Sequence, residues 1–239
     1  SEVNAFRHIA PGSYIVSSEL AMLLARAMRL RTLTKGAFDP AVAPLLEKAG
    51  YGRADVVAPI AADLHSWSIA GELLTISGPT AFDLGGIGKG YAIDRVFELL
   101  RDEGHEFVLV EGGGDMVGTV KADGSPWRVA VEWPGRPDSA VSLVNLAHAG
   151  FAASDVFRRR FRDGHHILDA TSGAPVRRVI GAAATARSAW DADTMTSLLF
   201  MSPAEEYRKL ATLYVAEYLV VDAVEKVYVS RKWEGEVYV

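Results

Sequence analysis

Apolar side chains recur every three or four positions in several stretches of the chain, which is the spacing of amphipathic helices. The stretch from Ser17 to Thr34 carries them at Leu20, Leu23, Leu24, Ala27, Leu30 and Leu33, after a serine that can cap a helix. A second helix is predicted from about Gly90 to Arg101, with Ile93, Val96, Phe97 and Leu100 facing inward. Two more are predicted, near Ala192 to Met201 and Pro203 to Tyr214, and Pro44 can open a short one.

From Phe107 to about Thr185 the pattern changes to short β-prone runs separated by Gly, Pro, Asp and Asn. These runs are FVLVE, WRVAVEW, AVSLVNL, HHILD and VIGAAATA. HSWSIAGELLTISG and the closing EYLVVDAVEKVYVSRKW each alternate around a turn, as hairpins do. Because helices and strands are grouped instead of alternating regularly, the pattern predicts an α+β fold with mainly antiparallel sheets and packed helices. No repeat or linker divides the chain, so we expect a single domain over residues 1–239.

Composition is that of a globular protein, with 239 residues of which 49% are hydrophobic and 23% charged. A formal net charge of −5 gives no broad basic field, so no nucleic-acid partner is predicted. The absence of cysteine excludes disulfides, thiolate metal sites and a cysteine nucleophile. No apolar run approaches the roughly 18 residues of a membrane span. The chain begins at Ser1, without Met, so we expect it to be soluble as given, and either cytoplasmic or exported after removal of a leader.

The stretch FDLGGIGKGYAID, residues 82–94, resembles a nucleotide-binding loop at first sight. A Walker loop requires Ser or Thr after its Gly-Lys, but Gly90 follows Lys89. A dinucleotide fingerprint starting at Gly86 requires a third glycine where Tyr91 stands. The clustered glycines therefore serve either to bring backbone N–H groups to an anion at a helix N-terminus or to form a tight turn, and spacing alone favours neither.

Three other clusters carry candidate chemistry. In DADTMTS, Asp193 and Ser197 are four residues apart on a predicted helix, so their side chains share one face. Their oxygen atoms suit Mg²⁺ or Ca²⁺. The alternative is that an aspartate at this position only caps the helix. In HHILD, strand alternation would put His166 and Leu168 on one face; His166 is either a general base or a hydrogen-bonded turn histidine. EGGGD is either a tight turn or a loop that lets a ligand approach the backbone.

The order of the motifs is more specific than any one of them. GAFDP, DLGGIGKGYAID, EGGGDM, PWRVAVEWP, DGHHILDATSGAP and ADTMTSLLF follow one another along nearly the whole chain. In both order and spacing this series resembles the ApbE family of FAD:protein FMN transferases. The resemblance implies a T-fold-like single domain, here without the strand and helix with which family members begin.

The resemblance also implies an activity, in which a magnesium-dependent enzyme transfers the FMN half of FAD to a threonine of an acceptor flavoprotein and releases AMP. Metal ligands would be Asp193, Ser197, Thr196 and the backbone carbonyl of Gly86. His166 would be the base that acts on the acceptor threonine. FAD would contact Ala37, Phe38, Asp39, Asp83, Lys89, Gly113, Gly114, Asp115 and Ile167.

The sequence departs from the family pattern in three motifs. Ala152, Ala153 and Ser154 stand where the family has Thr-Ser-Gly, a segment near the flavin phosphates. Ser197 replaces a threonine and keeps an oxygen ligand, and Ala170 replaces the proline of the histidine motif. The first departure keeps two alternatives open: a relative that binds FAD without transferring it, and a magnesium-dependent pyrophosphatase that splits FAD into FMN and AMP.

Overall fold

The computed structural model describes residues 2–51, 66–78, 80–161 and 164–238. Contacts divide the chain into two compact units, each made of two segments. The first unit is Ser1–Gly85 with Arg159–Val176, and the second is Gly86–Arg158 with Arg177–Val239. Each unit is described by itself below.

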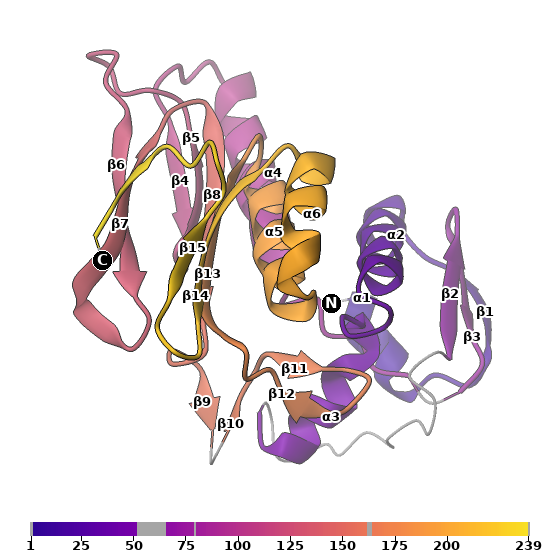
Figure 1. Ribbon diagram of the computed structural model, residues 1–239. Helices are drawn as coiled ribbons and strands as arrows, with labels where there is room; N and C mark the ends of the chain where they lie inside the picture. The colour runs from indigo at the N-terminus through magenta and orange to yellow at the C-terminus, as the bar shows by residue number, and fades with distance from the viewer. Residues whose placement is uncertain (1, 52–65, 79, 162–163, 239) are drawn as a thin grey trace. The chain divides into compact units, whose positions relative to one another are not determined.

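The first unit consists of helices, a small sheet and two short hairpins (Figure 1). Its helices are α1 (Glu2–Ala5), η1 (Phe6–His8), α2 (Ser18–Leu33), η2 (Pro40–Val42) and α3 (Ala43–Ala49). The sheet has the order β1-β3-β2, formed by β1 (Gly12–Ile15), β2 (Trp67–Ala70) and β3 (Leu73–Ile76). The hairpins pair β9 (Arg160–Phe161) with β10 (Gly164–His165) and β11 (Leu168–Asp169) with β12 (Ala174–Pro175).

Helix α2 forms where the sequence predicts it. The Ser17 hydroxyl accepts a hydrogen bond from the Leu20 amide over 3.1 Å and so satisfies one of the free N–H groups of the first turn. Leu20, Leu24, Ala27 and Leu30 form the buried face of the helix. The inward side of the sheet supplies Trp67, Leu74 and Ile76 to the core of this unit.

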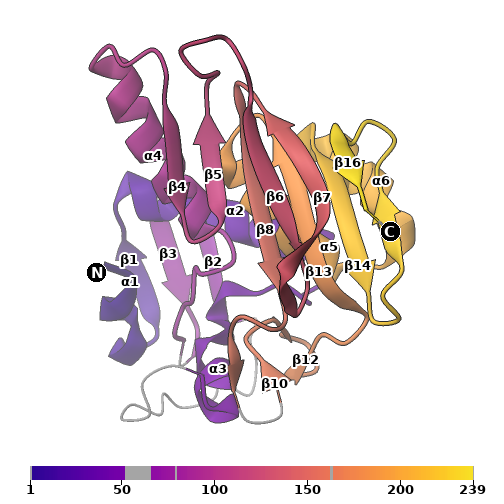
Figure 2. The ribbon, with the colours of Figure 1, turned by 90° about the vertical axis from the view of Figure 1, so that its left-hand side faces the viewer.

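The second unit has three layers: a small sheet, a large sheet and helices (Figures 1 and 2). The large sheet has the order β15-β14-β13-β8-β5-β4, and the small one β16-β7-β6. Their strands are β4 (Leu109–Gly112), β5 (Asp115–Gly118), β6 (Trp127–Trp133), β7 (Arg136–Leu146), β8 (Ala149–Asp155), β13 (Val179–Ala186), β14 (Glu217–Asp222), β15 (Val227–Val229) and β16 (Gly235–Val237). The helices are α4 (Gly88–Asp102), α5 (Ala189–Met201), η3 (Ala204–Glu206) and α6 (Tyr207–Tyr214).

Two apolar clusters hold these layers together. Val129, Val144, Phe151 and Val221 belong to the cluster between the two sheets. On the helix side, Ile93 of α4 and Ala189 of α5 pack with Val117 of β5. Helix α5 lies against β8 and β13 and is buried along most of its length, which places its polar residues in the interior of the unit.

The structure confirms the α+β class, since every strand pair among the described residues is antiparallel. Three local predictions were wrong. HHILD is not one strand but two short ones, β10 and β11, separated by a bend at His166 and Ile167. Val96 of α4 is 46% exposed instead of facing inward, whereas Ile93 and Phe97 on the other face pack toward the sheet. The last predicted helix divides into η3 and α6.

Candidate functional site

The GAFDP motif in the first unit begins where helix α2 ends. Gly36, at φ +92°, donates its amide to the Arg31 carbonyl over 2.8 Å, which closes the helix in a left-handed turn. The Thr34 hydroxyl accepts from the Phe38 amide over 2.9 Å. Ala37 and Phe38 are buried as a result, so their side chains support the loop from within.

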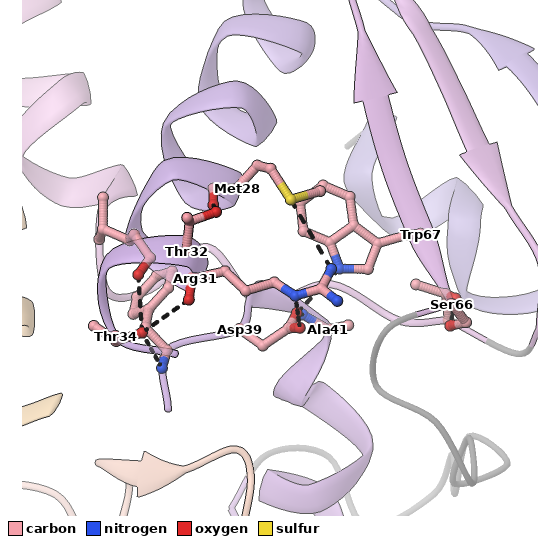
Figure 3. Close-up of polar contacts among 11 residues, drawn as sticks. Met28, Arg31, Thr32, Thr34, Asp39, Ala41, Ser66 and Trp67 are labelled. Carbon is pink, nitrogen blue, oxygen red and sulfur yellow. Dashed lines mark hydrogen bonds and ion pairs between the residues drawn. The ribbon is translucent and has the colours of Figure 1, made fainter. Parts of the chain in front are cut away.

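Asp39 is the centre of a polar cluster (Figure 3). Its Oδ1 accepts from the Ala41 amide over 2.8 Å and from the Trp67 indole over 3.1 Å. Its Oδ2 faces the Arg31 Nε over 3.2 Å, and the Arg31 guanidinium also lies over the Trp67 ring. No part of the Asp39 side chain is exposed. The carboxylate therefore fixes the loop to α2 and β2, and its contact with FAD stays a prediction.

Backbone hydrogen bonds connect this loop to two other motifs of the first unit. The Asp83 amide donates to the Pro40 carbonyl over 2.6 Å, and the Ala170 amide donates to the Ala37 carbonyl over 2.9 Å. Asp83 in turn accepts from the Gly85 amide over 2.6 Å, so its side chain shapes the start of the glycine loop. GAFDP, DLGG and the histidine motif are thus held in one network, although they lie far apart in the sequence.

The two adjacent histidines have different surroundings. His165 is buried, and its Nε2 lies 2.9 Å from the Val176 carbonyl, while its Nδ1 accepts from the Ile167 amide over 3.3 Å. His166 is half-buried in the bend, and its ring is stacked on that of Tyr51. Both ring nitrogens of His165 contact backbone atoms of Val176 and Ile167, so this ring has a structural role, and the role of His166 as a base stays a prediction. Sequence spacing did not indicate the contribution of Tyr51.

In the second unit, helices α4 and α5 cap each other. The Gly90 amide, in the first turn of α4, donates to the Asp193 carboxylate of α5 over 3.0 Å. In the other direction, Asp94 of α4 accepts from the amides of Ala189 and Trp190 over 2.8 and 2.9 Å. These are N–H groups that a helix start leaves unsatisfied. Burial raises the pKa of Asp94 above its usual value.

This arrangement explains one glycine of the loop. A Cβ atom at Gly90 would lie 2.4 Å from the Ala189 carbonyl oxygen and 2.8 Å from the Asp193 Cβ. Only glycine lets the two helices approach this closely, so Gly90 serves helix packing as well as capping. Asp94 is a residue that sequence reasoning missed, because a cap supplied by another helix leaves no local pattern.

The predicted metal ligands lie at this helix pair. The Ser197 hydroxyl donates to the Gly86 carbonyl over 2.6 Å, and Asp193 is only 2% exposed. Thr196 is fully buried, and its hydroxyl donates to the Asp193 carbonyl of its own helix over 2.8 Å. The structure thus brings Gly86 and Ser197 into contact, with Asp193 one helical turn away.

The donor set fits magnesium. It consists of hard oxygen atoms, and cis oxygens around Mg²⁺ lie about 3 Å apart, so the Gly86–Ser197 pair needs to open only slightly. Among the residues that the structure describes, no three His, Asp or Glu side chains form a group that could hold a metal ion. An ion held here would complete its shell with water and ligand oxygens, which is how Mg²⁺ is usually bound beside phosphates.

The EGGGD turn belongs to the second unit and carries three of the predicted FAD contacts. Gly113 and Gly114 have φ values of +65° and +93°, which favour glycine, and the Gly114 amide donates to Glu111 over 2.8 Å. Asp115 is fully buried, accepts from the Ala153 amide over 3.3 Å and forms an ion pair with Lys89 of α4. This ion pair joins the turn to the glycine loop. The Lys89 side chain is 28% exposed, so its cation remains accessible to an anion.

A hollow of about 400 Å³ opens beside this turn, within the second unit. Its lining includes Gly113, Gly114, Ala153 and Ser154, apolar side chains from both sheets, and the charged residues Glu111, Glu132, Asp155 and Arg158. Ala152, by contrast, points into the core with no exposed surface. Ala153 packs on the side of the cluster between the two sheets, whereas strand alternation puts Ser154 on the same face as Ala152.

Comparisons with known proteins agree with these motifs. The sequence matches the ApbE family over residues 1–220. It is 34% identical over 223 residues to an FAD:protein FMN transferase of Vibrio cholerae. The aligned region covers 84% of this chain and 66% of that protein. The chain thus spans about two thirds of the length of this curated relative.

Solved structures show the same fold. The ApbE protein of Thermotoga maritima superposes with a TM-score of 0.84 at 26% identity, covering 99% of this chain and 84% of that one. The flavin transferase ApbE of Vibrio cholerae gives a TM-score of 0.79 at 28% identity, covering 95% and 79%. No helix in the described part of the chain is long and apolar enough to cross a membrane. With its motifs, its fold and its sequence in agreement, the chain belongs to the ApbE family.

Proposed function

We propose that this chain is a magnesium-dependent FAD:protein FMN transferase, which transfers FMN to a threonine of an acceptor flavoprotein and releases AMP. The observation that carries the proposal is the contact of the Gly86 carbonyl with the Ser197 hydroxyl, beside the buried Asp193 carboxylate. Such an oxygen-rich site suits a divalent cation that accompanies a pyrophosphate. The similarity to an FAD:protein FMN transferase and to a flavin transferase of known structure supports the same reaction.

In the proposed reaction, the acceptor threonine oxygen attacks the phosphorus atom that carries the FMN half of FAD. A new P–O bond forms, the bond from this phosphorus to the bridging oxygen breaks, and AMP leaves with that oxygen and its electron pair. His166 accepts the proton of the threonine hydroxyl, since an imidazole is suited to proton transfer near neutral pH. His166 lies in the bend between β10 and β11, and the proposal assigns this step to it and a structural role to His165.

Asp193, Ser197, Thr196 and the Gly86 carbonyl would hold the magnesium ion. When bound, this ion would neutralise part of the negative charge on the pyrophosphate. Lys89 adds a positive charge beside the glycine loop, and its ion pair with Asp115 fixes the direction of its side chain. We assign FAD contacts to Ala37, Phe38, Asp39, Asp83, Lys89, Gly113, Gly114, Asp115 and Ile167.

One incubation separates the candidate activities. The chain is mixed with FAD, MgCl₂ and an acceptor domain that carries the threonine motif, and the products are resolved by gel fluorescence and chromatography. Flavin on the acceptor together with AMP supports transfer. AMP and free FMN without a labelled acceptor would replace transfer by pyrophosphatase activity, and intact bound FAD would leave only binding.

Three variants assign the roles. His166→Ala is expected to abolish labelling and to keep FAD binding, whereas Asp193→Ala should lose both magnesium dependence and activity. Lys209→Ala, at an exposed position of α6, is the matched control and should behave as the wild type. Labelling that survives in His166→Ala would refute the assignment of the base.

One observation favours the alternative in which the chain binds FAD without transferring FMN. Ala152 and Ala153 lack the hydroxyls that the family carries at these positions, and Ala153 is beside the hollow. If loss of transfer follows from this segment, Ala153→Ser, which adds a hydroxyl beside the hollow and leaves the buried Ala152 unchanged, should restore it. Comparing this variant with the wild type therefore distinguishes a chain that has lost transfer activity from an active chain that was assayed with the wrong acceptor.

A further inference from the structure

We propose that Tyr51 is a positioning residue for His166, an inference that rests on the proposed function. The two ring centroids lie 5.8 Å apart with an angle of 28° between the planes, which is a stacked arrangement. Both residues belong to the first unit and both are half-buried. The phenol ring thus limits the rotation of the imidazole that accepts the proton.

The backbone of Tyr51 is fixed by the end of helix α3. Gly50, at φ +99°, donates to the Glu47 carbonyl over 3.0 Å, and the Tyr51 amide donates to the Leu46 carbonyl over 2.8 Å. This pair of bonds is a Schellman motif, with Tyr51 directly after the left-handed residue. Glu47 is paired with Arg7, which ties the helix to the N-terminal segment of the same unit.

His166 itself lies outside any regular element, between β10 and β11. The residues on either side are held: His165 by the Val176 carbonyl, and Leu168 by pairing with Pro175. The Val176 amide also donates to the Ile167 carbonyl over 3.0 Å, which fixes the main chain next to His166, while the χ angles of His166 depend on its side-chain contacts. The Tyr51 ring supplies such a contact.

Stacking suits a general base better than a hydrogen bond to a ring nitrogen would. His165 shows the alternative, because its contacts with Val176 and Ile167 use both of its nitrogens. Contact with a ring face orients the imidazole and uses neither nitrogen. The geometry therefore points to a role for the Tyr51 ring, and not for its hydroxyl, which lies 3.5 Å from an Arg159 nitrogen at the limit of a hydrogen bond.

The test compares Tyr51→Phe, which keeps the ring, with Tyr51→Leu, which removes it. Tyr228→Leu is the control, since this tyrosine is 42% exposed on strand β15 of the second unit. Rates of flavin transfer and KM for FAD are measured at saturating acceptor. Misplacement of a catalytic group costs roughly 10- to 100-fold in rate, so kcat of Tyr51→Leu should fall by about this factor with KM for FAD nearly unchanged. Tyr51→Phe and Tyr228→Leu should retain the wild-type rate.

A spectroscopic readout makes the test independent of activity. In protein labelled at histidine, the ring current of Tyr51 should displace the His166 imidazole resonances, which are identified by their loss in His166→Gln. Tyr51→Leu should remove this displacement and leave the His165 resonances in place. A melting curve for each variant establishes that it is folded.

The outcomes separate the two proposals. If the wild-type chain transfers no flavin, the proposed function fails and this inference falls with it. If transfer occurs and Tyr51→Leu keeps the wild-type kcat, or if the His166 resonances do not move, the positioning role alone is refuted. A rate that is lost in Tyr51→Leu and restored in Tyr51→Phe supports it.

Discussion

The Gly90 amide donates to the Asp193 carboxylate over 3.0 Å, and four residues further along α4 the Asp94 carboxylate accepts from the first turn of α5. Each helix thereby supplies the N-terminal cap of the other. Asp193 is also a proposed magnesium ligand, so the same carboxylate connects helix packing with the candidate metal site. Changes at either cap should consequently affect both stability and metal binding.

Replacing Gly90 by alanine should destabilise the protein. The new methyl group would lie 2.4 Å from a backbone oxygen of Ala189, which cannot move without shifting α5. Overpacking of this kind costs about 1–3 kcal/mol, and the displaced Asp193 should weaken magnesium binding as well. Urea unfolding and magnesium titration by calorimetry measure the two effects. Gly78→Ala is the control, because its Cβ would meet only Ser66 at an ordinary 3.4 Å; equal stability of the two variants would contradict the packing argument.

Asp94→Asn should lower the free energy of unfolding by about 1 kcal/mol at neutral pH. The asparagine side chain has only one acceptor oxygen for the two backbone amides that the carboxylate binds. The cost should also depend on pH. Burial raises the pKa of Asp94 above 3.8, so its titration favours the folded state below that pH, and the contribution is lost as the pH rises through the raised value. From about pH 4 upward, the wild type should therefore lose stability relative to Asp94→Asn. The difference between their free energies of unfolding should then level off at higher pH.

Asp123→Asn provides the opposite trend as a control. The Ser125 hydroxyl lowers the pKa of the Asp123 carboxyl, so the stability that this group contributes is lost as the pH falls. Urea unfolding at a series of pH values compares the two variants with the wild type. The same sign of pH dependence in both would contradict the burial of Asp94.

Helix α2, the hairpin of β2 and β3 and strand β13 could be predicted from the sequence because local periodicity determines them. Their apolar faces and turn residues lie within a few positions of one another. The bend at His166 could not be predicted in this way. It depends on Val176 accepting from His165 and on Ala37 accepting from Ala170, and these partners are distant in sequence.

The candidate site shows the same limit. The resemblance implied that Gly86 and Ser197 hold the same metal ion; the structure shows a hydrogen bond between them, and their role as metal ligands stays a prediction. The roles of Asp94 and Tyr51 were missed, since each acts on a residue about a hundred positions away and neither has a distinctive spacing. Gly90 was recognised as part of a glycine cluster, but its specific reason, the approach of Ala189, is visible only in three dimensions.

Ser197→Thr and Ser197→Ala should behave differently toward magnesium. Threonine keeps the hydroxyl that faces the Gly86 carbonyl, whereas alanine removes one oxygen donor from the proposed set. Loss of a ligand-shell partner typically reduces metal affinity by about 10- to 100-fold, so Ser197→Ala should need correspondingly more MgCl₂ to saturate binding. Calorimetry in the absence of FAD measures this directly. Equal magnesium affinity in all three proteins would remove Ser197 from the site.

The two histidines should separate stability from activity. His165→Ala removes a buried ring and its contact with Val176, so unfolding should be easier by about 2 kcal/mol. His166→Ala, at a half-buried position, should leave stability within about 0.5 kcal/mol and affect only flavin transfer. Urea unfolding and transfer assays on both variants test this division. A His166→Ala protein as unstable as His165→Ala would mean that His166 is mainly structural.

Lys89 and Asp115 allow a structural charge to be distinguished from a ligand-binding one. Lys89→Met leaves the fully buried Asp115 carboxylate without its cation, and removal of one partner from such a pair is strongly destabilising, by about 3 kcal/mol. Adding Asp115→Asn removes the uncompensated charge, so the double variant should recover most of the stability. It should not recover FAD affinity, because the cation proposed to face the phosphates is still missing. Fluorescence titration with FAD and urea unfolding, run on the single and double variants, measure the two properties separately. If FAD affinity returns together with stability, Lys89 serves only to neutralise Asp115.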